Sequence, residues 1–222
     1  EADRAARVGG EAAGVAAVLG AEVRYVSNRD ERAPAVEAAA EELRRAGRRP
    51  YVIPIGASTP LGAAAFVQAV AEMRDQLPSP PDVIVHSTSS GGTQAGLVAG
   101  CALADLPTRV IGISADETSA SLEREVRSII DGLPSLLGVS GDRVRSVSVD
   151  VDDRFVGGGY GVPTDASQEA IELLARSEAI FLDPTYRAKA MAGMIAGIRA
   201  DKFSEDQTIL FWHTGGQVGL FA

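Results

Sequence analysis

With 222 residues, 45% of them hydrophobic and 23% charged, the chain has the composition of an ordinary globular protein, with room for one domain or two small ones. Its formal net charge of −9 argues against nucleic acid or an anionic membrane surface as a partner. No apolar run approaches the ~20 residues of a membrane span, and no secretion signal is visible, so we expect a cytoplasmic protein.

The first quarter of the chain alternates helical and strand patterns. It opens on Glu1 rather than Met, which leads us to expect further residues upstream. The patterns predict, in order, an alanine-rich helix, a strand, an amphipathic helix and a second strand, over Ala2–Leu19, Glu22–Val26, Ala35–Ala46 and Tyr51–Ile55. A helix over Leu61–Met73 follows, which Ser58-Thr59-Pro60 is suited to begin.

The segment 82–96 has the pattern of an anion-binding loop. Val83–Val85 predicts a buried parallel strand, Ser87–Thr93 is a run of seven small residues, and a helical pattern runs from Thr93 to Leu103. A loop of this kind presents backbone N–H groups and hydroxyls at a helix N-terminus, where a phosphate is stabilised. The alternative is a serine- and glycine-rich loop without a ligand.

This loop differs from the common nucleotide-binding loops. A P-loop carries a lysine after its last glycine, whereas Thr93 is followed here by Gln94. The glycine spacing also differs from that of the dinucleotide-binding fingerprint. We therefore expect the phosphate to belong to another cofactor.

The remainder of the chain continues the alternation. The predicted strands are Arg109–Ser114, Arg145–Val151 and Ile209–Trp212, and the predicted helices are Ser121–Ile130, Ser167–Ser177 and Thr185–Arg199. Phe155–Pro163 is too rich in glycine for regular structure. The alternation predicts an α/β fold with a mostly parallel twisted sheet and helices on both faces.

Ligands of such sheets bind beyond the carboxyl ends of the strands. The loops there are Gly56–Pro60, Ser87–Thr93, Ser114–Glu117 and His213–Gly216. We expect no metal site, because the sequence lacks a cluster of ligands at suitable spacing. The single cysteine, Cys101, cannot form an intrachain disulfide and falls on a helix face predicted to be buried.

Five motifs together resemble the D-cysteine desulfhydrase and 1-aminocyclopropane-1-carboxylate (ACC) deaminase family. They are, in order, Tyr51-Val52-Ile53-Pro54, Gly91-Gly92-Thr93-Gln94-Ala95-Gly96, Gly159-Tyr160-Gly161-Val162-Pro163, Asp183-Pro184-Thr185-Tyr186 and His213-Thr214-Gly215-Gly216. No single motif is decisive, but the ordered set is specific and spans nearly the whole chain. The resemblance implies a pyridoxal 5'-phosphate (PLP) enzyme with the tryptophan synthase β-like fold.

The resemblance also implies roles for particular residues. The phosphate cup would consist of Ser89, Ser90, Gly91, Gly92 and Thr93. Thr214, with Gly215 beside it, matches the residue expected near the pyridine nitrogen. Tyr160 and Tyr186 match two tyrosines on the substrate side of the ring, where they would act in catalysis, and the alternative is that both fill an aromatic core.

Two features depart from the family pattern. The lysine that forms the Schiff base, and a Ser-Asn-His segment, are expected upstream of Glu1, so that neither Lys189 nor Lys202 would take this role. Arg187 stands where ACC deaminases carry an acid and desulfhydrases a small residue. It would either point toward the pyridine nitrogen or turn outward and pair with Glu178 or Asp183.

The expected activity is β-elimination from D-cysteine or a related small amino acid. The alternatives are ACC deamination, another reaction of the same fold type, or a non-catalytic module that binds phosphate compounds. By the same resemblance, residues 1–48 would be the remainder of a small domain and residues 49–222 the large PLP-binding domain. The intact protein would be a homodimer.

Overall fold

The computed structural model describes residue 16 and residues 18–216. The chain divides into two compact units, residues 1–57 and residues 58–222. We expected a division between residues 48 and 49, and the assignment of the two parts to a small and a large domain stays a prediction. Among the described residues, no helix is both long and apolar enough to cross a membrane.

The first unit contains one long helix within its described part. This helix, α2, spans Arg32–Arg45, where Ala35–Ala46 was predicted, and its last turn carries two arginines that favour the negative end of the helix dipole. The helix predicted over 2–19 lies largely outside the described residues. The strands predicted over 22–26 and 51–55 are wrong. Neither segment pairs with a neighbouring strand among the described residues, and a strand pattern without such a partner forms no ladder.

The second unit is built on a sheet of four parallel strands in the order β3-β2-β1-β4. The strands are β1 Val83–Thr88, β2 Arg109–Ser114, β3 Asp150–Asp152 and β4 Ile209–Trp212. The predicted α/β fold with a parallel sheet is therefore confirmed. Strand β3 is shorter than the predicted Arg145–Val151, because the chain around Arg145 forms a short helix instead.

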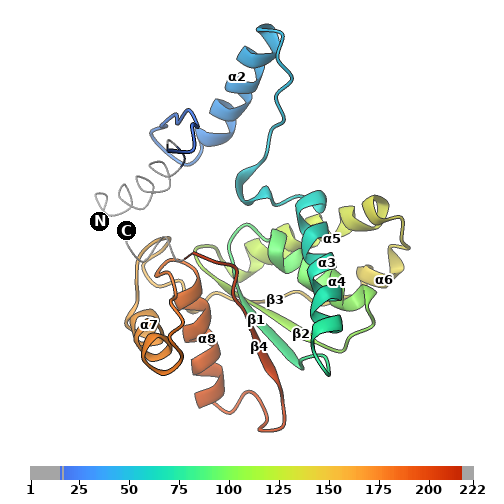
Figure 1. Cartoon of the computed structure of the whole chain (residues 1–222), viewed down its shortest axis with the longest axis vertical. Helices are drawn as coiled ribbons and strands as arrows, with labels where there is room; N and C mark the ends of the chain where they lie inside the picture. Colours follow the sequence, from blue (N-terminus) through green and yellow to red (C-terminus); the bar gives the residue numbers. More distant parts are fainter. Residues whose placement is uncertain (1–15, 17, 217–222) are drawn as a thin grey trace. The chain divides into compact units, whose positions relative to one another are not determined.

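Helices cover both faces of this sheet, with α3, α4 and α5 on one side and α7 and α8 on the other (Figure 1). The helices of this unit are α3 Pro60–Gln76, α4 Gly92–Leu103, α5 Ser119–Leu137, α6 Asp142–Arg145, α7 Asp165–Glu178 and α8 Arg187–Arg199. Three of them start on a threonine cap: Thr59 accepts from Gly62 N–H and Thr164 from Ser167 N–H, both at 3.1 Å, and Thr118 accepts from Ser121 N–H at 3.3 Å.

Successive residues of the strands enter opposite cores. Ile84 and Val110 pack in the core beneath α3, α4 and α5, whereas Val85 and Ile111 pack in the core beneath α8. Burial of a side chain such as Ile84, which is fully enclosed, stabilises the fold by about 2 kcal/mol. The double burial explains why these strands are continuously apolar rather than alternating.

Candidate functional site

The parallel order places every strand's carboxyl end, and the loop that follows it, at the same edge of the sheet. The loop after β1 leads through Ser89 and Ser90 to α4, as predicted. Gly91 is the N-cap of α4 and has φ +82°, a left-handed conformation that glycine adopts without steric cost. The N–H groups of the first turn of α4 have no intrahelical partners, so the loop forms a cup that favours an anion.

Ser58 joins this cup from the segment before α3. Its hydroxyl contacts Ser90 Oγ at 2.7 Å and accepts a hydrogen bond from Gly92 N–H at 3.3 Å. A Cβ on Gly92 would lie 2.9 Å from Ser58 Oγ, so glycine permits this close approach. Sequence reasoning placed Ser58 at the start of a helix, whose cap is in fact Thr59, and within Gly56–Pro60, one of the loops expected to bind a ligand. Its place in that loop was the available indication, but nothing in the sequence showed that its hydroxyl reaches Ser90.

Further polar atoms lie just before the cup. Ser87 Oγ and Thr88 Oγ1 are buried at the end of β1 and have no hydrogen-bond partner among the described residues. Unpaired buried hydroxyls are costly unless a ligand or water satisfies them. The hydroxyls of the cup and the N-terminus of α4 fit a phosphate ester.

Tyr160 and Tyr186 come together although 26 residues separate them in the chain. Their hydroxyl oxygens lie 2.5 Å apart, and their rings meet edge to face with centroids 5.6 Å apart. Tyr160 is half-exposed in the loop after β3, so its ring does not fill an aromatic core. Burial, and then the hydrogen bond to Tyr160, raise the pKa of Tyr186, which therefore keeps its proton at neutral pH.

Asp183 fixes the start of α8. Its buried carboxylate accepts hydrogen bonds from the backbone N–H groups of Thr185, Tyr186 and Arg187 at 3.1, 2.8 and 3.2 Å. A carboxylate in this position caps the helix and is stabilised by its dipole. It therefore sets the position from which the Tyr186 and Arg187 side chains project.

The Arg187 side chain pairs with Asp183, one of the two partners expected for an outward orientation, but it is largely buried and also contacts Thr214. Its Nη1 atom donates to Asp183 Oδ2 at 3.2 Å, and Nη2 donates to both the carbonyl oxygen and Oγ1 of Thr214 at 2.9 Å. Asp183 rather than Glu178 is its carboxylate partner. Gly215, beside Thr214, has φ +93° and donates its N–H to His213 Nδ1 at 3.3 Å.

The structure thus pairs the two tyrosines, joins Arg187 to Thr214 and forms the cup, and all three groups lie at the carboxyl edge of the sheet. Lys202 is exposed beyond α8, and Lys189 is fully buried in the first turn of α8.

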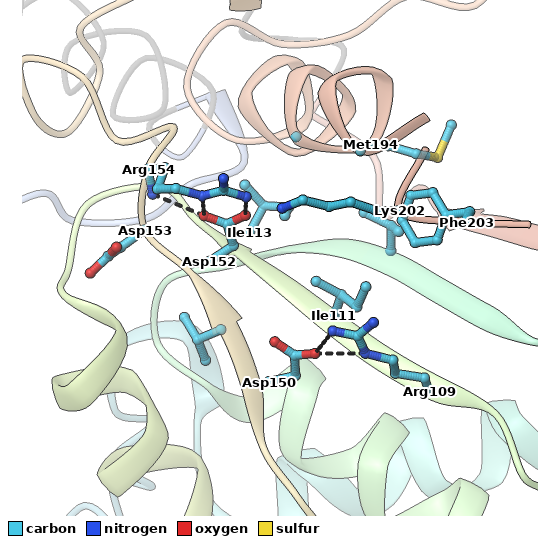
Figure 2. A pocket seen from close by; sticks show the side chains of 14 residues that line it. Arg109, Ile111, Ile113, Asp150, Asp152, Asp153, Arg154, Met194, Lys202 and Phe203 are labelled. Atoms are coloured by element: carbon cyan, nitrogen blue, oxygen red, sulfur yellow. Dashed lines mark hydrogen bonds and ion pairs between the residues drawn. The ribbon is translucent and has the colours of Figure 1, made fainter. Parts of the chain in front are cut away.

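A pocket of about 320 Å³ lies against the α8 side of the sheet, but none of the predicted site residues lines it (Figure 2). Four of its charged side chains are already paired, because Arg109 contacts Asp150 and Arg154 contacts Asp152. We therefore place the candidate site at the cup and the tyrosine pair rather than in this pocket.

Comparisons with known proteins identify the fold and family of the chain. A family model described as "Pyridoxal-phosphate dependent enzyme" matches residues 10–215. A D-cysteine desulfhydrase from Salmonella paratyphi C (strain RKS4594) is 37% identical over 185 residues, which cover 82% of this chain and 55% of the relative. The D-cysteine desulfhydrase of Salmonella newport (strain SL254) is 36% identical with the same coverage. The chain spans about half the length of these curated relatives.

Solved structures extend the comparison. An ACC deaminase homologue matches with a TM-score of 0.85 and 34% identity, covering 92% of this chain and 62% of that chain. The processed form of threonine deaminase isoform 2 from Solanum lycopersicum matches with a TM-score of 0.53 and 17% identity, over 81% of this chain and 52% of that chain, which shows a shared fold alone. From the family match over nearly its whole length, the chain belongs to the pyridoxal-phosphate dependent enzymes.

Proposed function

We propose that this chain is part of a PLP-dependent lyase that converts D-cysteine, or a related small amino acid, and water to pyruvate, ammonia and sulfide. The observation that carries the proposal is the contact between the phenols of Tyr160 and Tyr186 at 2.5 Å, at the sheet edge that also carries the cup. The likeness to proteins named D-cysteine desulfhydrase supports this choice of substrate.

The residues present fit PLP at both of its ends. The cup of Ser89, Ser90, Gly91, Gly92 and Thr93 would hold the phosphate at the N-terminus of α4. Thr214, with Gly215 beside it, would meet the pyridine nitrogen. Because Arg187 donates to Thr214 Oγ1, the hydroxyl proton of Thr214 remains available for an acceptor such as an unprotonated ring nitrogen. PLP, when bound, supplies an electron sink for the substrate.

The two phenols supply proton transfer. Tyr186 keeps its proton because its pKa is raised, and the Tyr160 oxygen lies within hydrogen-bond distance of it. In this arrangement Tyr186 can donate to Tyr160, and the pair can hold or pass one proton beside a substrate. β-Elimination requires such groups, since a proton leaves Cα and a thiolate leaves Cβ.

Arg187 favours elimination over opening of the ACC ring. Its charge is permanent, and its guanidinium occupies the place where an acid is expected in an ACC deaminase. A carboxylate there would stabilise a protonated ring nitrogen, whereas a guanidinium does not. An unprotonated ring withdraws electrons more weakly, which matters most for a reaction that needs a long-lived carbanion. We expect ACC turnover at least ~100-fold below that of D-cysteine, equivalent to ~2.7 kcal/mol.

The test compares the two substrates on the intact protein loaded with PLP. Sulfide and pyruvate are measured with D-cysteine, and ammonia release is measured with ACC, for the unmutated protein and for Arg187→Glu. Equal or better ACC activity in the unmutated protein would contradict the proposal. A visible absorption band of lysine-bound PLP, near ~410–430 nm, distinguishes an enzyme of this fold from a non-catalytic phosphate-binding module.

The domain and assembly expectations extend the proposal. Residues 1–48 would belong to the small domain, residues 49–222 to the large one, and the intact protein would be a homodimer. Light scattering on the intact protein tests the dimer, and a monomeric mass would refute it.

A further inference from the structure

The ammonium of Lys189 is held in a cage of backbone carbonyl groups. The side chain has no solvent exposure. Its Nζ atom donates to the carbonyl oxygens of Ala115 at 3.0 Å, Val156 at 2.8 Å and Gly159 at 2.8 Å. An ammonium has three N–H donors, so all of them are used and none is left for a ligand.

These acceptors belong to two segments that are far apart in the sequence. Ala115 directly follows β2, and the other two carbonyls belong to the glycine-rich loop 155–163 between β3 and α7. Lys189 itself belongs to the first turn of α8. Its side chain therefore ties the loop to the end of one strand and the beginning of one helix.

Phe155 anchors the first residue of the loop 155–163 in the core beside α8, but the glycine-rich segment that follows is held more weakly. Four of the loop's nine residues are glycines, which lose the most conformational freedom on ordering. Its own backbone hydrogen bonds are long, with Val156 N to Asp153 O at 3.3 Å, Gly159 N to Val156 O at 3.4 Å and Val162 N to Gly159 O at 3.2 Å. The bonds from Lys189 are shorter and charge-assisted, so each is stronger than these.

The tether is adjacent to a residue of the candidate site. Gly159, whose carbonyl accepts from Lys189, directly precedes Tyr160. Tyr186, the partner of Tyr160, lies three residues before Lys189 at the beginning of α8. The segment that begins α8 thus contacts the loop twice, through an ammonium and through a phenol.

We propose that Lys189 is a positioning residue, whose buried ammonium holds the loop 155–163 so that the Tyr160 phenol meets that of Tyr186. The importance of this contact for turnover rests on the proposed function, whereas the positioning itself does not. Desolvation lowers the pKa of Lys189, and the nearby carboxylate of Asp116 offsets only part of this effect. Burying the ammonium therefore carries a desolvation cost that a neutral methionine would avoid. Methionine would instead leave three carbonyl groups without this donor.

The first experiment measures amide hydrogen exchange by mass spectrometry on the intact protein. In Lys189→Met we expect exchange within residues 155–163 to accelerate at least about 10-fold, while the core strands change by less than about 2-fold. Lys202→Met is the matched control, because it removes the other lysine, which is exposed, and should leave exchange in the loop unchanged. Unchanged exchange in Lys189→Met, or uniform acceleration throughout the protein, would overturn the proposal.

Chemical rescue tests the cage itself and serves if Lys189→Met does not fold. Lys189→Ala removes Cγ, Cδ, Cε and Nζ of the lysine, which correspond to a propylammonium ion. Added propylammonium should therefore fill the space and restore slow exchange in the loop. Tetramethylammonium, which carries the same charge but no N–H donor, should not. Rescue by both ions, or by neither, would contradict a tether made of hydrogen bonds.

Activity gives a third, separate readout on the holoenzyme with D-cysteine. If Lys189 acts through Tyr160, the loss of kcat in Lys189→Met and in Tyr160→Phe should be non-additive in the double variant. Additive losses would show that Lys189 acts elsewhere and would overturn the positioning role in catalysis. Inactivity of the unmutated protein on D-cysteine would instead contradict the proposed function, while the exchange result would still decide the positioning of the loop.

Discussion

Arg187 and Thr214 are joined by two hydrogen bonds, because one guanidinium nitrogen donates to both the carbonyl and the hydroxyl oxygen of the threonine at 2.9 Å. The same guanidinium pairs with the buried carboxylate of Asp183. Strand β4 is thereby connected to the beginning of α8, and the conformation of the loop after β4 depends on this connection.

Gly216→Ala should break this connection. A Cβ at residue 216 would lie 2.6 Å from Asp183 Oδ2 and 2.7 Å from Arg187 Nη1. Gly215→Ala is a matched control, since φ is +93° at Gly215 and +94° at Gly216, but a Cβ at 215 meets nothing within 4 Å. Both variants carry the same backbone strain, and we expect Gly216→Ala to lose about 1–3 kcal/mol more in urea unfolding. Equal losses would mean that the ion pair moves aside freely.

His86 should make stability depend on pH. Burial lowers its pKa from 6.5 to about 4, so the folded protein keeps the ring neutral where the unfolded chain binds a proton. The free energy of unfolding is therefore unaffected by His86 above about pH 6.5. It decreases as the pH drops toward 4, by about 3 kcal/mol in total. His86→Phe should remove this part of the slope in urea unfolding curves, whatever its constant cost. His213→Phe should preserve it, because that variant still contains His86, and a slope unchanged in His86→Phe would refute the assignment.

Gln94 should contribute to the stability of the sheet edge. It is fully buried, and its Nε2 atom donates to the carbonyl oxygen of Asp150 in β3 at 2.7 Å. Gln94→Met should cost about 1–2 kcal/mol in the free energy of unfolding, because the carbonyl loses its donor. Gln168→Met, at an exposed position where the amide contacts Glu172, is the control and should change stability by less than about 0.5 kcal/mol. Similar effects of the two substitutions would contradict a structural role for Gln94.

Cys101 should be unreactive in the folded protein. Burial raises the pKa of its thiol to about 11, and the thiolate is the reactive form. Treatment with iodoacetamide at about pH 8 should leave the mass of the native protein unchanged and add one adduct in urea. Stoichiometric labelling without denaturant would show that the α4 face bearing Cys101 opens readily.

The sequence was sufficient to predict three strands of the sheet and the small-residue loop that leads into α4, because these are local patterns. The apolar runs of β1, β2 and β4 and the glycines before α4 carry their structural meaning in adjacent residues. The strand predicted over 51–55 shows the limit, since the same kind of pattern forms no ladder without a neighbouring strand.

The contacts that organise the candidate site were not predictable in this way. Ser58 lies 32 residues from Ser90 in the chain, and Arg187 lies 27 from Thr214. Each of these pairs is determined by the packing of helices on the sheet rather than by spacing in the sequence. Gln94 shows the same limit, because its place in the glycine motif gave no indication that its amide reaches β3.

The order of the strands in the sheet also determines when each strand can pair during synthesis of the chain. β1 lies between β2 and β4, and the hydrogen bond from Thr208 N–H to the Asp82 carboxylate joins positions 126 residues apart. Contacts of such long range form late and slow the folding of a chain. On a ribosome, the cup and α4 would emerge well before β4, so one side of β1 would stay unpaired until residues 209–212 are made. Thr214 emerges later still, and the nascent chain therefore acquires a complete candidate site only after its central strand is enclosed.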